Sequence, residues 1–352
     1  MDLGQLELPP KLAIIGAGAW GTGLAVHAAR QGLAVTIWAY EREVVEDINQ
    51  RRRNSAFLPG LDLPGPITAV TNLGEALAGQ KLVLVVVPSH VMRQVAAQMA
   101  PMAEPGAAFI SASKGIEDET SATMVQILEE ELSSNLGLEL GALSGPSFAL
   151  EVARGLPTAV TLAMRSLPQA KIIQTLLSSP TFRIYTSLDL MGVELGGALK
   201  NVYAIATGIC DGFALGLNAR AAMLPRAISE MSRMAVARGG NPLTLMGLSG
   251  MGDLILTATG ELSRNRKVGL RLGAGERLAD ILSGTREVAE GIRNARAIHN
   301  MALRHRVDMP MAREVYLVLY EGKEPRQGMV DLLTRPLKDE LDPLHQGFGL
   351  SV

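Results

Sequence analysis

The sequence is poor in cysteine, has no excess of charge of one sign and contains no long hydrophobic run. Its one cysteine, Cys210, excludes an internal disulfide, so the chain is not a disulfide-rich secreted domain. Lysine and arginine total 33 against 35 aspartate and glutamate, a net charge of −2. That balance gives no general attraction to nucleic acid or to anionic membranes. The longest strongly apolar run, 82–88, is far too short to cross a bilayer.

Targeting and metal-binding patterns are missing as well. The first ten residues have neither the basic start nor the apolar run of a signal peptide. The histidines show no metal-ligand spacing, and a single cysteine supplies no partner ligand. We therefore expect a cytoplasmic protein with no metal, no nucleic-acid partner and no membrane insertion.

The 352 residues, of which 47% are hydrophobic, suffice for about two domains. In the first half, short apolar runs alternate with helical patterns that include an acidic helix over 120–132. Strand, helix and strand in short succession predict an α/β fold with a mostly parallel, doubly wound sheet. Strand signals stop near Tyr185, and the second half looks all-helical. The predicted parts are a flexible leader at 1–10, an α/β domain at 11–191, an all-α domain at 192–340 and a flexible tail at 341–352.

The stretch GAGAWG, 16–21, follows the first predicted strand and opens the first helix. In this setting Gly16 permits the tight turn, Gly18 lets backbone N–H groups approach a pyrophosphate, and Gly21 lets helix and strand pack closely. The helix N-terminus adds partial positive charge. The motif predicts that the first domain is a Rossmann-type dinucleotide-binding domain.

The end of the second strand bears on the choice of dinucleotide. An acidic residue there would hold the ribose 2′-hydroxyl of NAD, but the pattern places Ala39 at that point. Arg42 and the run 51–53 could instead meet a 2′-phosphate. An arginine run that simply faces water is an equally good interpretation. We expect NADP as the preferred cofactor, with NAD as the alternative.

Lys200 stands alone among uncharged residues in LGGALKNVYA, 195–204. On a helix its own face carries Gly196, Gly197, Ala204 and Thr207, all of them small. Two adjacent glycines cost on the order of 1 kcal/mol each relative to alanine, which makes sense if a backbone or a ligand comes close. A partly desolvated lysine there could act as an acid or base. A lysine that extends from a domain seam to water fits the pattern equally well.

A second polar cluster lies further along, where Asp253 and Thr257 precede the block SRNRK, 263–267. Arg264 could clamp a phosphate, with Asn265 and helix-start N–H groups completing the oxygen shell. Taken alone, a basic helix start that faces solvent is the simpler interpretation. No aromatic residues are interleaved with the block, which argues against a nucleic-acid surface.

Ten separated blocks carry a family resemblance. They are GAGAWGTGLA, NSAFLPG, VVPSH, SKG, SGPSFA, GVELGGALKNV, GLNARAA, GMGDLILT, SRNRKVG and EGIRNAR. Together, from about residue 11 to 340, they resemble NAD(P)-dependent sn-glycerol-3-phosphate dehydrogenase of the bacterial type. The resemblance implies an enzyme that reversibly reduces dihydroxyacetone phosphate to sn-glycerol 3-phosphate for phospholipid synthesis.

The resemblance also implies residue roles. Lys200 would be the catalytic acid/base and Asp253 would position its ammonium group. The substrate side would comprise Lys114, Gly145, Ser147, Asn201, Thr257, Ser263, Arg264 and Asn265. The cofactor side would comprise Gly16, Gly18, Ala19, Trp20, Gly21, Tyr40, Lys114, Ala149, Arg264, Val288 and Glu290. Relatives often carry histidine or arginine at the position of Tyr40, so the loss of charge there weakens the expectation of NADP.

Two other functions stay open. A β-hydroxyacid or ketopantoate-type NADP reductase can share the two-domain plan and a lysine on a helix, although its substrates present a carboxylate, which an arginine could also bind. A nucleotide-binding sensor without turnover could use the same fold. Lys200, Lys114, Asp253 and Arg264 together argue against a sensor, which needs no proton donor. An exposed apolar surface in the second half would favour a homodimer.

Overall fold

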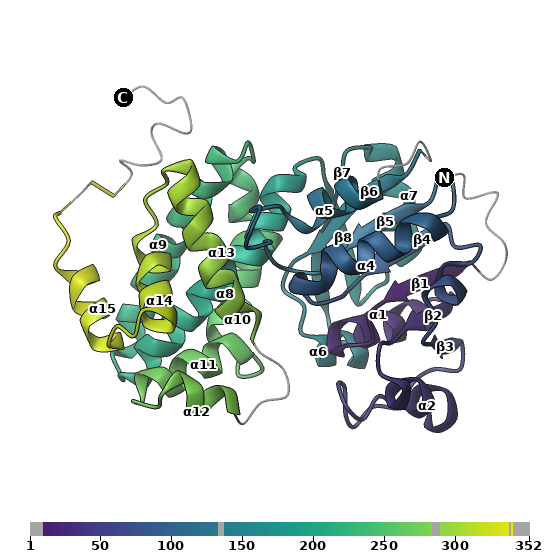
Figure 1. Cartoon of the computed structure of the whole chain (residues 1–352), viewed down its shortest axis with the longest axis horizontal. Coiled ribbons are helices and arrows are strands. Elements are labelled where there is room, and N and C mark those ends of the chain that lie inside the picture. Colours follow the sequence, from purple (N-terminus) through teal and green to yellow (C-terminus); the bar gives the residue numbers. More distant parts are fainter. Residues whose placement is uncertain (1–9, 133–136, 284–288, 338, 341–352) are drawn as a thin grey trace. The chain divides into compact units, whose positions relative to one another are not determined.

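The computed structural model describes residues 10–132, 137–283, 289–337 and 339–340. The predicted tail at 341–352, and the predicted leader except for Pro10, lie outside the described residues. The chain forms two compact units. The sheet unit comprises Met1–Ser113 and Met124–Leu190, and the helical unit comprises Lys114–Thr123 and Met191–Val352. Figure 1 shows β-strands in the first and helices in the second.

The sheet unit is built around an eight-stranded sheet with the order β3-β2-β1-β4-β5-β6-β7-β8. The strands are β1 Lys11–Ile15, β2 Ala34–Trp38, β3 Ile67–Val70, β4 Leu82–Val85, β5 Ala108–Ser111, β6 Glu139–Ser144, β7 Thr158–Met164 and β8 Phe182–Ser187. All neighbouring pairs are parallel except β6 and β7. The predicted mostly parallel, doubly wound sheet is confirmed. The sequence reading missed β3, a four-residue strand at the edge of the sheet.

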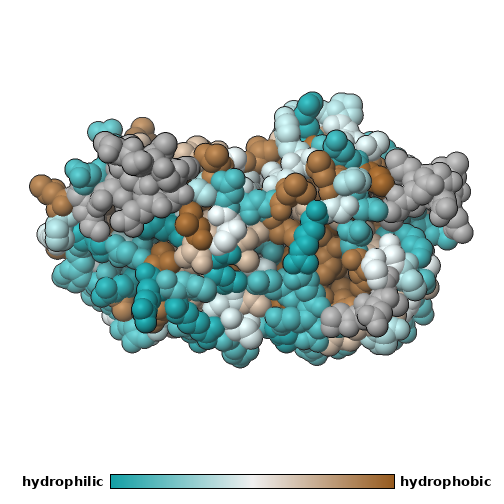
Figure 2. Space-filling view, turned by 90° about the horizontal axis from the view of Figure 1, so that it is seen from above, coloured by the Kyte–Doolittle hydropathy of each residue, from teal (hydrophilic) through white to brown (hydrophobic). Residues whose placement is uncertain are grey.

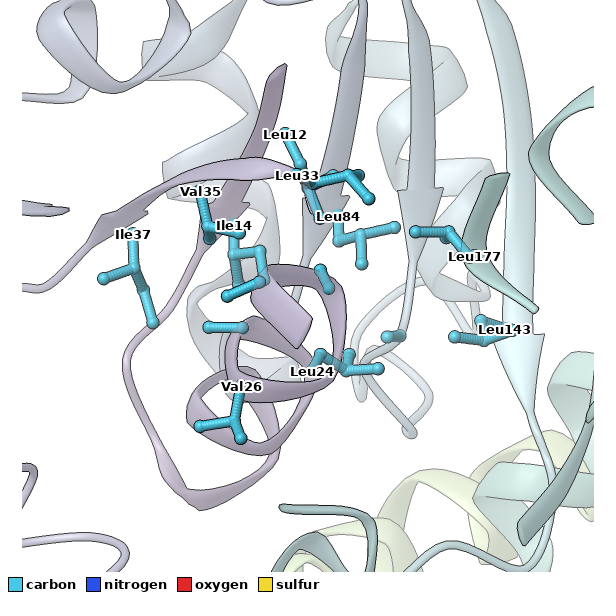
Figure 3. Packing of buried hydrophobic residues seen from close by; sticks show 14 of the residues in the cluster. Leu12, Ile14, Leu24, Val26, Leu33, Val35, Ile37, Leu84, Leu143 and Leu177 are labelled. Carbon is cyan, nitrogen blue, oxygen red and sulfur yellow. The ribbon is translucent and has the colours of Figure 1, made fainter. Parts of the chain in front are cut away.

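Helices connect these strands and cover the sheet. They are α1 Ala19–Arg30, α2 Arg42–Arg51, α3 Leu73–Leu77, α4 Met92–Met99, α5 Met124–Glu131, α6 Ala149–Arg154 and α7 Leu167–Leu177, with single turns η2 Ser89–Val91 and η3 Ala100–Met102. Every residue of β4 and β5 is buried, as expected for strands covered on both faces. Leu12 and Ile14 of β1, Val35 and Ile37 of β2 and Leu24 of α1 belong to one buried cluster (Figure 3).

The acidic helix starts later than the sequence predicts. The expected span was 120–132, but α5 begins at Met124. The preceding residues, Lys114–Thr123, form a turn that belongs to the helical unit. Within it Ser121 has a φ of 62°, a left-handed conformation that cannot continue a helix. The chain therefore leaves the sheet unit after β5 and returns to it at α5.

The helical unit is formed by α8 Leu190–Gly212, α9 Gly216–Ala237, η4 Pro242–Met246, η5 Leu248–Gly252, α10 Asp253–Thr259, α11 Arg264–Gly273, α12 Leu278–Ser283, α13 Glu290–His305, α14 Pro310–Tyr320 and α15 Pro325–Leu333. No strand occurs among its described residues, which confirms the all-helical prediction. The middle of α8, from Leu195 to Cys210, is buried throughout, so this helix runs through the core. In the described part of the chain, no helix has the length and apolar character that a membrane crossing requires.

Hydrophilic side chains cover most of the face shown in Figure 2, and hydrophobic side chains emerge in several separate places. In the helical unit the exposed apolar residues include Leu217 and Leu243, whose exposed fractions are 74% and 62%.

Candidate active site

The glycine-rich turn of the sheet unit connects β1 to α1, where strand order reverses between β1 and β4. Gly16 has a φ of 121°, and a Cβ atom there would lie 2.6 Å from the carbonyl oxygen of Val86. A Cβ at Gly21 would lie 1.9 Å from the carbonyl oxygen of Gly16. A Cβ at Gly18, in contrast, would meet nothing within 4 Å. The turn therefore needs glycine at 16 and 21 for its own packing, and Gly18 borders open space where a ligand can approach the backbone.

The turn is held by Asn54, which the sequence analysis did not single out as a site residue. Its Nδ2 donates hydrogen bonds of 2.8 Å to the carbonyl oxygen of Ala17 and to Oγ1 of Thr22. The Asn54 side chain is buried at 1% exposure. The block NSAFLPG, which begins with Asn54, is the sequence signal for this residue. An asparagine buried in a loop needs hydrogen-bond partners for its amide, and here it finds them in the glycine-rich turn.

The start of α1 suits an anion. Its N-cap is Gly18, which offers no side-chain cap, and its first turn holds no acidic residue. Among the described residues, the buried Nε1 of Trp20 has no hydrogen-bond partner. N–H groups at a helix start attract phosphate oxygens, and a buried indole N–H without a partner is costly unless a ligand accepts from it. These features fit the pyrophosphate end of a dinucleotide.

Other predicted residues of the sheet unit lie at the same edge of the sheet, after the C-terminal ends of parallel strands. Tyr40 follows β2 and is 83% exposed, and Ala39 beside it is buried. Gly145 follows β6 with a φ of 146°, and the Ser147 hydroxyl donates to its carbonyl oxygen over 2.9 Å. Ala149 begins α6, which packs closely on α1 at Gly23. Open α/β sheets bind their ligands at this edge.

The four arginines considered for a 2′-phosphate all have protein partners. Arg42 pairs with Glu46, Arg51 with Asp47 and Arg53 with Asp62. Arg52 donates to the carbonyl oxygens of Pro64 and Ile67. Arg52 therefore has a structural role, because its bonds fasten the end of α2 to the segment that leads into β3.

In the helical unit, two lysines converge on one buried carboxylate. The ammonium of Lys200, on α8, donates to Oδ1 of Asp253 and, over 2.9 Å, to Oγ1 of Thr257. The ammonium of Lys114 donates to Oδ2 of Asp253 over 2.6 Å. The Asp253 side chain is 1% exposed and that of Lys200 is 8% exposed. The structure thus brings together four predicted residues from three chain segments.

Burial lowers the pKa of Lys200 from its ordinary value to about 7. Desolvation is the largest cause, the Asp253 charge opposes it, and the nearby Lys114 charge adds to the lowering. An amine with a pKa near neutrality can both donate and accept a proton under working conditions. The geometry and the pKa together favour an acid/base over a lysine that reaches water.

Gly196, the first of the two glycines before Lys200, makes room for protein backbone. A Cβ at Gly196 would lie 2.5 Å from the carbonyl oxygen of Ser249, which belongs to η5. Because η5 leads directly into α10, this close approach sets Asp253 opposite Lys200. Of the two interpretations of the small-residue face, the approach of a backbone is the one that the structure shows at Gly196.

Asn201, next to Lys200 on α8, joins a second polar group. Nδ2 of Asn265 donates to Oδ1 of Asn201, and the backbone N–H of Gly291 donates to Oδ1 of Asn265, both over 2.9 Å. Ser263 caps α11 by accepting from the N–H of Arg266. The starts of α11 and α13 therefore meet at the two asparagines.

Arg264 is exposed at the first position of α11. Desolvation lowers its pKa and the charge of Glu290 opposes this change, so the two side chains lie within electrostatic reach. Glu290 begins α13, and Val288 lies outside the described residues. In the described part of the chain, no group of three or more His, Cys, Asp or Glu side chains is arranged to hold a metal ion.

Paired glycines let α8 and α11 cross with their backbones in contact. A Cβ at Gly269 would lie 2.0 Å from the carbonyl oxygen of Ile205, and one at Gly208 would lie 2.2 Å from that of Arg266. Gly212 and Gly273 repeat the contact one turn later. Lys200 lies on α8, and Arg264 and Asn265 begin α11. The crossing therefore fixes the position of these two residues relative to Lys200.

Comparisons with known proteins agree along the chain. Family models described as the N-terminus and the C-terminus of NAD-dependent glycerol-3-phosphate dehydrogenase match residues 11–170 and 189–330. A glycerol-3-phosphate dehydrogenase (NAD(P)+) of Geobacter sulfurreducens is 48% identical over 330 residues, covering 94% of this chain and 98% of that protein. The crystal structure of a glycerol-3-phosphate dehydrogenase from Coxiella burnetii has 38% identity and a TM-score of 0.89, covering 92% of this chain and 99% of that one.

A ketopantoate reductase from Ralstonia eutropha also aligns, over 91% of this chain and 99% of that one, with a TM-score of 0.58 and 16% identity. At that identity the likeness shows a shared fold alone.

Proposed function

The chain belongs to the family of NAD-dependent glycerol-3-phosphate dehydrogenases, and we propose that Lys200 is the acid/base of the family's reaction. Members are oxidoreductases that use NAD or NADP and reduce dihydroxyacetone phosphate to sn-glycerol 3-phosphate. The observation that supports Lys200 is its buried ammonium, which Asp253 and Thr257 hold in one orientation.

The reaction needs a proton at the C2 oxygen of the substrate when the nicotinamide supplies a hydride to C2. Protonated Lys200 would stabilise the developing negative charge on that oxygen and then deliver the proton. Asp253 would keep the ammonium in place, because its two oxygens accept from Lys200 and Lys114. In the reverse direction the neutral amine would take the proton from the hydroxyl group.

We further propose where the substrate's other groups bind. Arg264, with Asn265 and the start of α11, would hold the phosphate, because an exposed guanidinium beside a helix N-terminus suits a dianion. Ser263 would contribute its hydroxyl proton while it caps the helix. Asn201, which follows Lys200 on α8, and Thr257, which accepts from the Lys200 ammonium, would contact the substrate hydroxyl groups. Lys114 would touch both cofactor and substrate, and Gly145 and Ser147 would line the substrate side from the sheet unit.

In the sheet unit, the turn around Gly18 would hold the pyrophosphate, with Ala19 and Trp20 at the start of α1 and Gly21 behind them. Tyr40 and Ala149 would contact the cofactor there, as would Val288 and Glu290 from the helical unit. We propose NADP as the preferred form. Arg42 supports this, since it begins α2 four residues after the end of β2, and its exposed side chain pairs at the surface with Glu46.

One assay decides the proposed activity. The purified protein is mixed with dihydroxyacetone phosphate and either NADH or NADPH, and nucleotide oxidation is followed by absorbance. Substrate-dependent oxidation is expected with at least one nucleotide, and faster with NADPH. No turnover with either, together with turnover of a 2-keto acid, would establish the ketopantoate-type reductase instead. Nucleotide binding without any turnover would establish the sensor.

Assembly, location and pathway complete the proposal. The exposed apolar residues of the helical unit support a homodimer, which sedimentation equilibrium would detect as twice the 37.4 kDa chain mass. We place the protein in the cytoplasm, where it would supply sn-glycerol 3-phosphate for phospholipid synthesis. A fusion to a fluorescent protein, imaged in cells, would test the location.

A further inference from the structure

The turn Lys114–Thr123 is attached to the helical unit at several points, although β5 and α5 of the sheet unit flank it. At its base, Ile116 and Thr123 form an isolated antiparallel bridge. Ile116 is 4% exposed and packs in the core of the helical unit. Oγ1 of Thr123 donates to Glu194 of α8 over 2.7 Å. The base of the turn is therefore anchored by apolar packing of Ile116 and by a charge-assisted hydrogen bond of Thr123.

The tip of the turn is fixed to one face of α13. Asp118 accepts from Nε of Arg296, and from Nδ2 of Asn300 over 3.0 Å. Arg304 donates to Oγ of Ser121 over 3.0 Å and to the carbonyl oxygen of Glu119 over 2.6 Å. Residues 296, 300 and 304 follow each other at intervals of four, so they form one row along the helix.

A further arginine holds the strained residue of the turn. Nη1 of Arg238, at the end of α9, donates to the carbonyl oxygen of Ser121 over 2.9 Å. Ser121 is 2% exposed and has a positive φ, which a non-glycine residue keeps only when its surroundings hold it there. The hydrogen bonds of this network all join protein groups to one another. Its common result is a rigid turn, and the first residue of that turn is Lys114.

Helix α13 also supports the part of the candidate site that contains Asn201 and Asn265. The first turn of α13 contributes the N–H of Gly291 to Asn265, and Asn294 donates to the carbonyl oxygen of Ala198 on α8. Helix α13 thus holds the asparagine pair at its start and the Lys114 turn along its later turns. A helix that fixes both sides of a site can set the distance between them.

We propose that Asp118, through Arg296 and Asn300 of α13, holds the Lys114–Thr123 turn so that Lys114 stays on Asp253. Asp118 is then a positioning residue of the reaction, and this inference rests on the proposed role of Lys114 at the cofactor and substrate. Lys114 lies only four residues from Asp118, and its ammonium is 2.6 Å from Asp253. A displacement of about 1 Å at a reacting site can cost up to 10²-fold in rate.

The test is a double-mutant cycle of Asp118→Ala and Lys114→Ala, read as kcat/KM for dihydroxyacetone phosphate. Asp118→Ala alone should lower kcat/KM on the order of tenfold. In the Lys114→Ala background the same change should cost less than about twofold, because the residue it positions is already gone. Asp118→Asn, which keeps the acceptor oxygen for Asn300, should fall between Asp118→Ala and the parent protein.

A matched control separates positioning from folding. Asp331 resembles Asp118 in accepting from two side chains, Lys323 and Gln327, and in being partly exposed, at 42% against 31%. Asp331→Ala should lower the thermal unfolding midpoint by about as much as Asp118→Ala does, and should leave kcat/KM within about twofold of the parent value. Arg304→Ala, which loosens the same tip, should reproduce the loss caused by Asp118→Ala.

Equal losses from Asp118→Ala in the two backgrounds would overturn the inference, as would normal kcat/KM in both Asp118→Ala and Arg304→Ala. The dissociation constant of NADPH gives a second readout. It is measured by NADPH fluorescence for the four proteins of the cycle, which are the parent, the two single variants and the double variant. Because this readout needs no turnover, it stays interpretable if the parent protein fails to reduce dihydroxyacetone phosphate. Failure of the proposed function and failure of this inference are therefore distinguishable.

Discussion

Lys200 and Asp253 lie 53 residues apart in the sequence and share a hydrogen bond in which the lysine donates and the aspartate accepts, both side chains being more than nine-tenths buried. The second oxygen of Asp253 accepts a hydrogen bond from Lys114, so one carboxylate faces two ammonium groups. An excess of positive charge in a desolvated place favours loss of a proton from one lysine. This arrangement supports the proposed role of Lys200 in proton transfer.

Removal of the Lys200 ammonium should abolish most turnover. For Lys200→Ala we expect kcat to fall by roughly 10²–10⁴, the usual contribution of a positioned acid or base. The measurement is nucleotide oxidation at saturating dihydroxyacetone phosphate. Lys171→Ala, which changes an exposed lysine of α7, is the control and should leave kcat unchanged. A Lys200→Ala protein with near-normal kcat would remove this residue from the mechanism.

The pH dependence should have opposite signs in the two directions. Since the pKa of Lys200 is lowered to about 7, the protonated form that reduction needs is lost as pH rises through that value. Reduction should therefore slow above about pH 7, and oxidation of sn-glycerol 3-phosphate should speed up. The measurement is kcat against pH in both directions. Parallel profiles in the two directions would contradict the assignment.

Lys114 should influence that profile. Its charge helps to lower the pKa of Lys200, so Lys114→Ala should raise that pKa and move the fall in the reductive kcat to higher pH. The same Lys171→Ala control should keep the original profile. A profile that stays in place in Lys114→Ala would mean that the two ammonium groups do not interact in the working enzyme.

Arg264 should act on binding of the phosphate. Arg264→Ala is expected to raise KM for dihydroxyacetone phosphate by roughly tenfold or more, because a hydrogen bond to a charged group is worth about 1.5–3 kcal/mol. With dihydroxyacetone, which lacks the phosphate, the parent protein and the variant should give the same kcat/KM. Arg277→Ala serves as the control, since Arg277 is an exposed arginine paired with Asp280. An equal loss with both substrates would exclude a phosphate role.

The crossing of α8 and α11 should tolerate no side chain. Gly269→Ala would place a Cβ 2.0 Å from a carbonyl oxygen, so the helices have to separate. We expect a loss of about 1–3 kcal/mol in the free energy of unfolding, measured by urea denaturation. Gly65→Ala, where a Cβ meets nothing within 4 Å, should change that free energy little. Equal stability of the two variants would show that the crossing adjusts freely.

Much of the fold could be predicted from local patterns. Buried strands such as β4 are recognisable as short apolar runs. The GAGAWG turn between a strand and a helix is typical of dinucleotide binding. The edge strand β3 could not be predicted in this way, because its four residues, with one exposed face, form too short a hydrophobic pattern. The sequence predicts too long an acidic helix, because helical spacing does not reveal that distant arginines hold Ser121 in a turn before the helix begins.

Local patterns in the sequence predict the alternation of strands and helices and the glycine-rich turn, and the family blocks lead to the lysine and the arginine proposed for the site. The three-dimensional structure was needed to show that Lys114 and Lys200 share Asp253, that Gly196 accommodates the Ser249 backbone, that Asn54 holds the glycine-rich turn and that Asp118 holds the Lys114–Thr123 turn. The reason is physical. Periodicity and turn chemistry act between neighbours in the chain, whereas desolvation and hydrogen bonding act between neighbours in space.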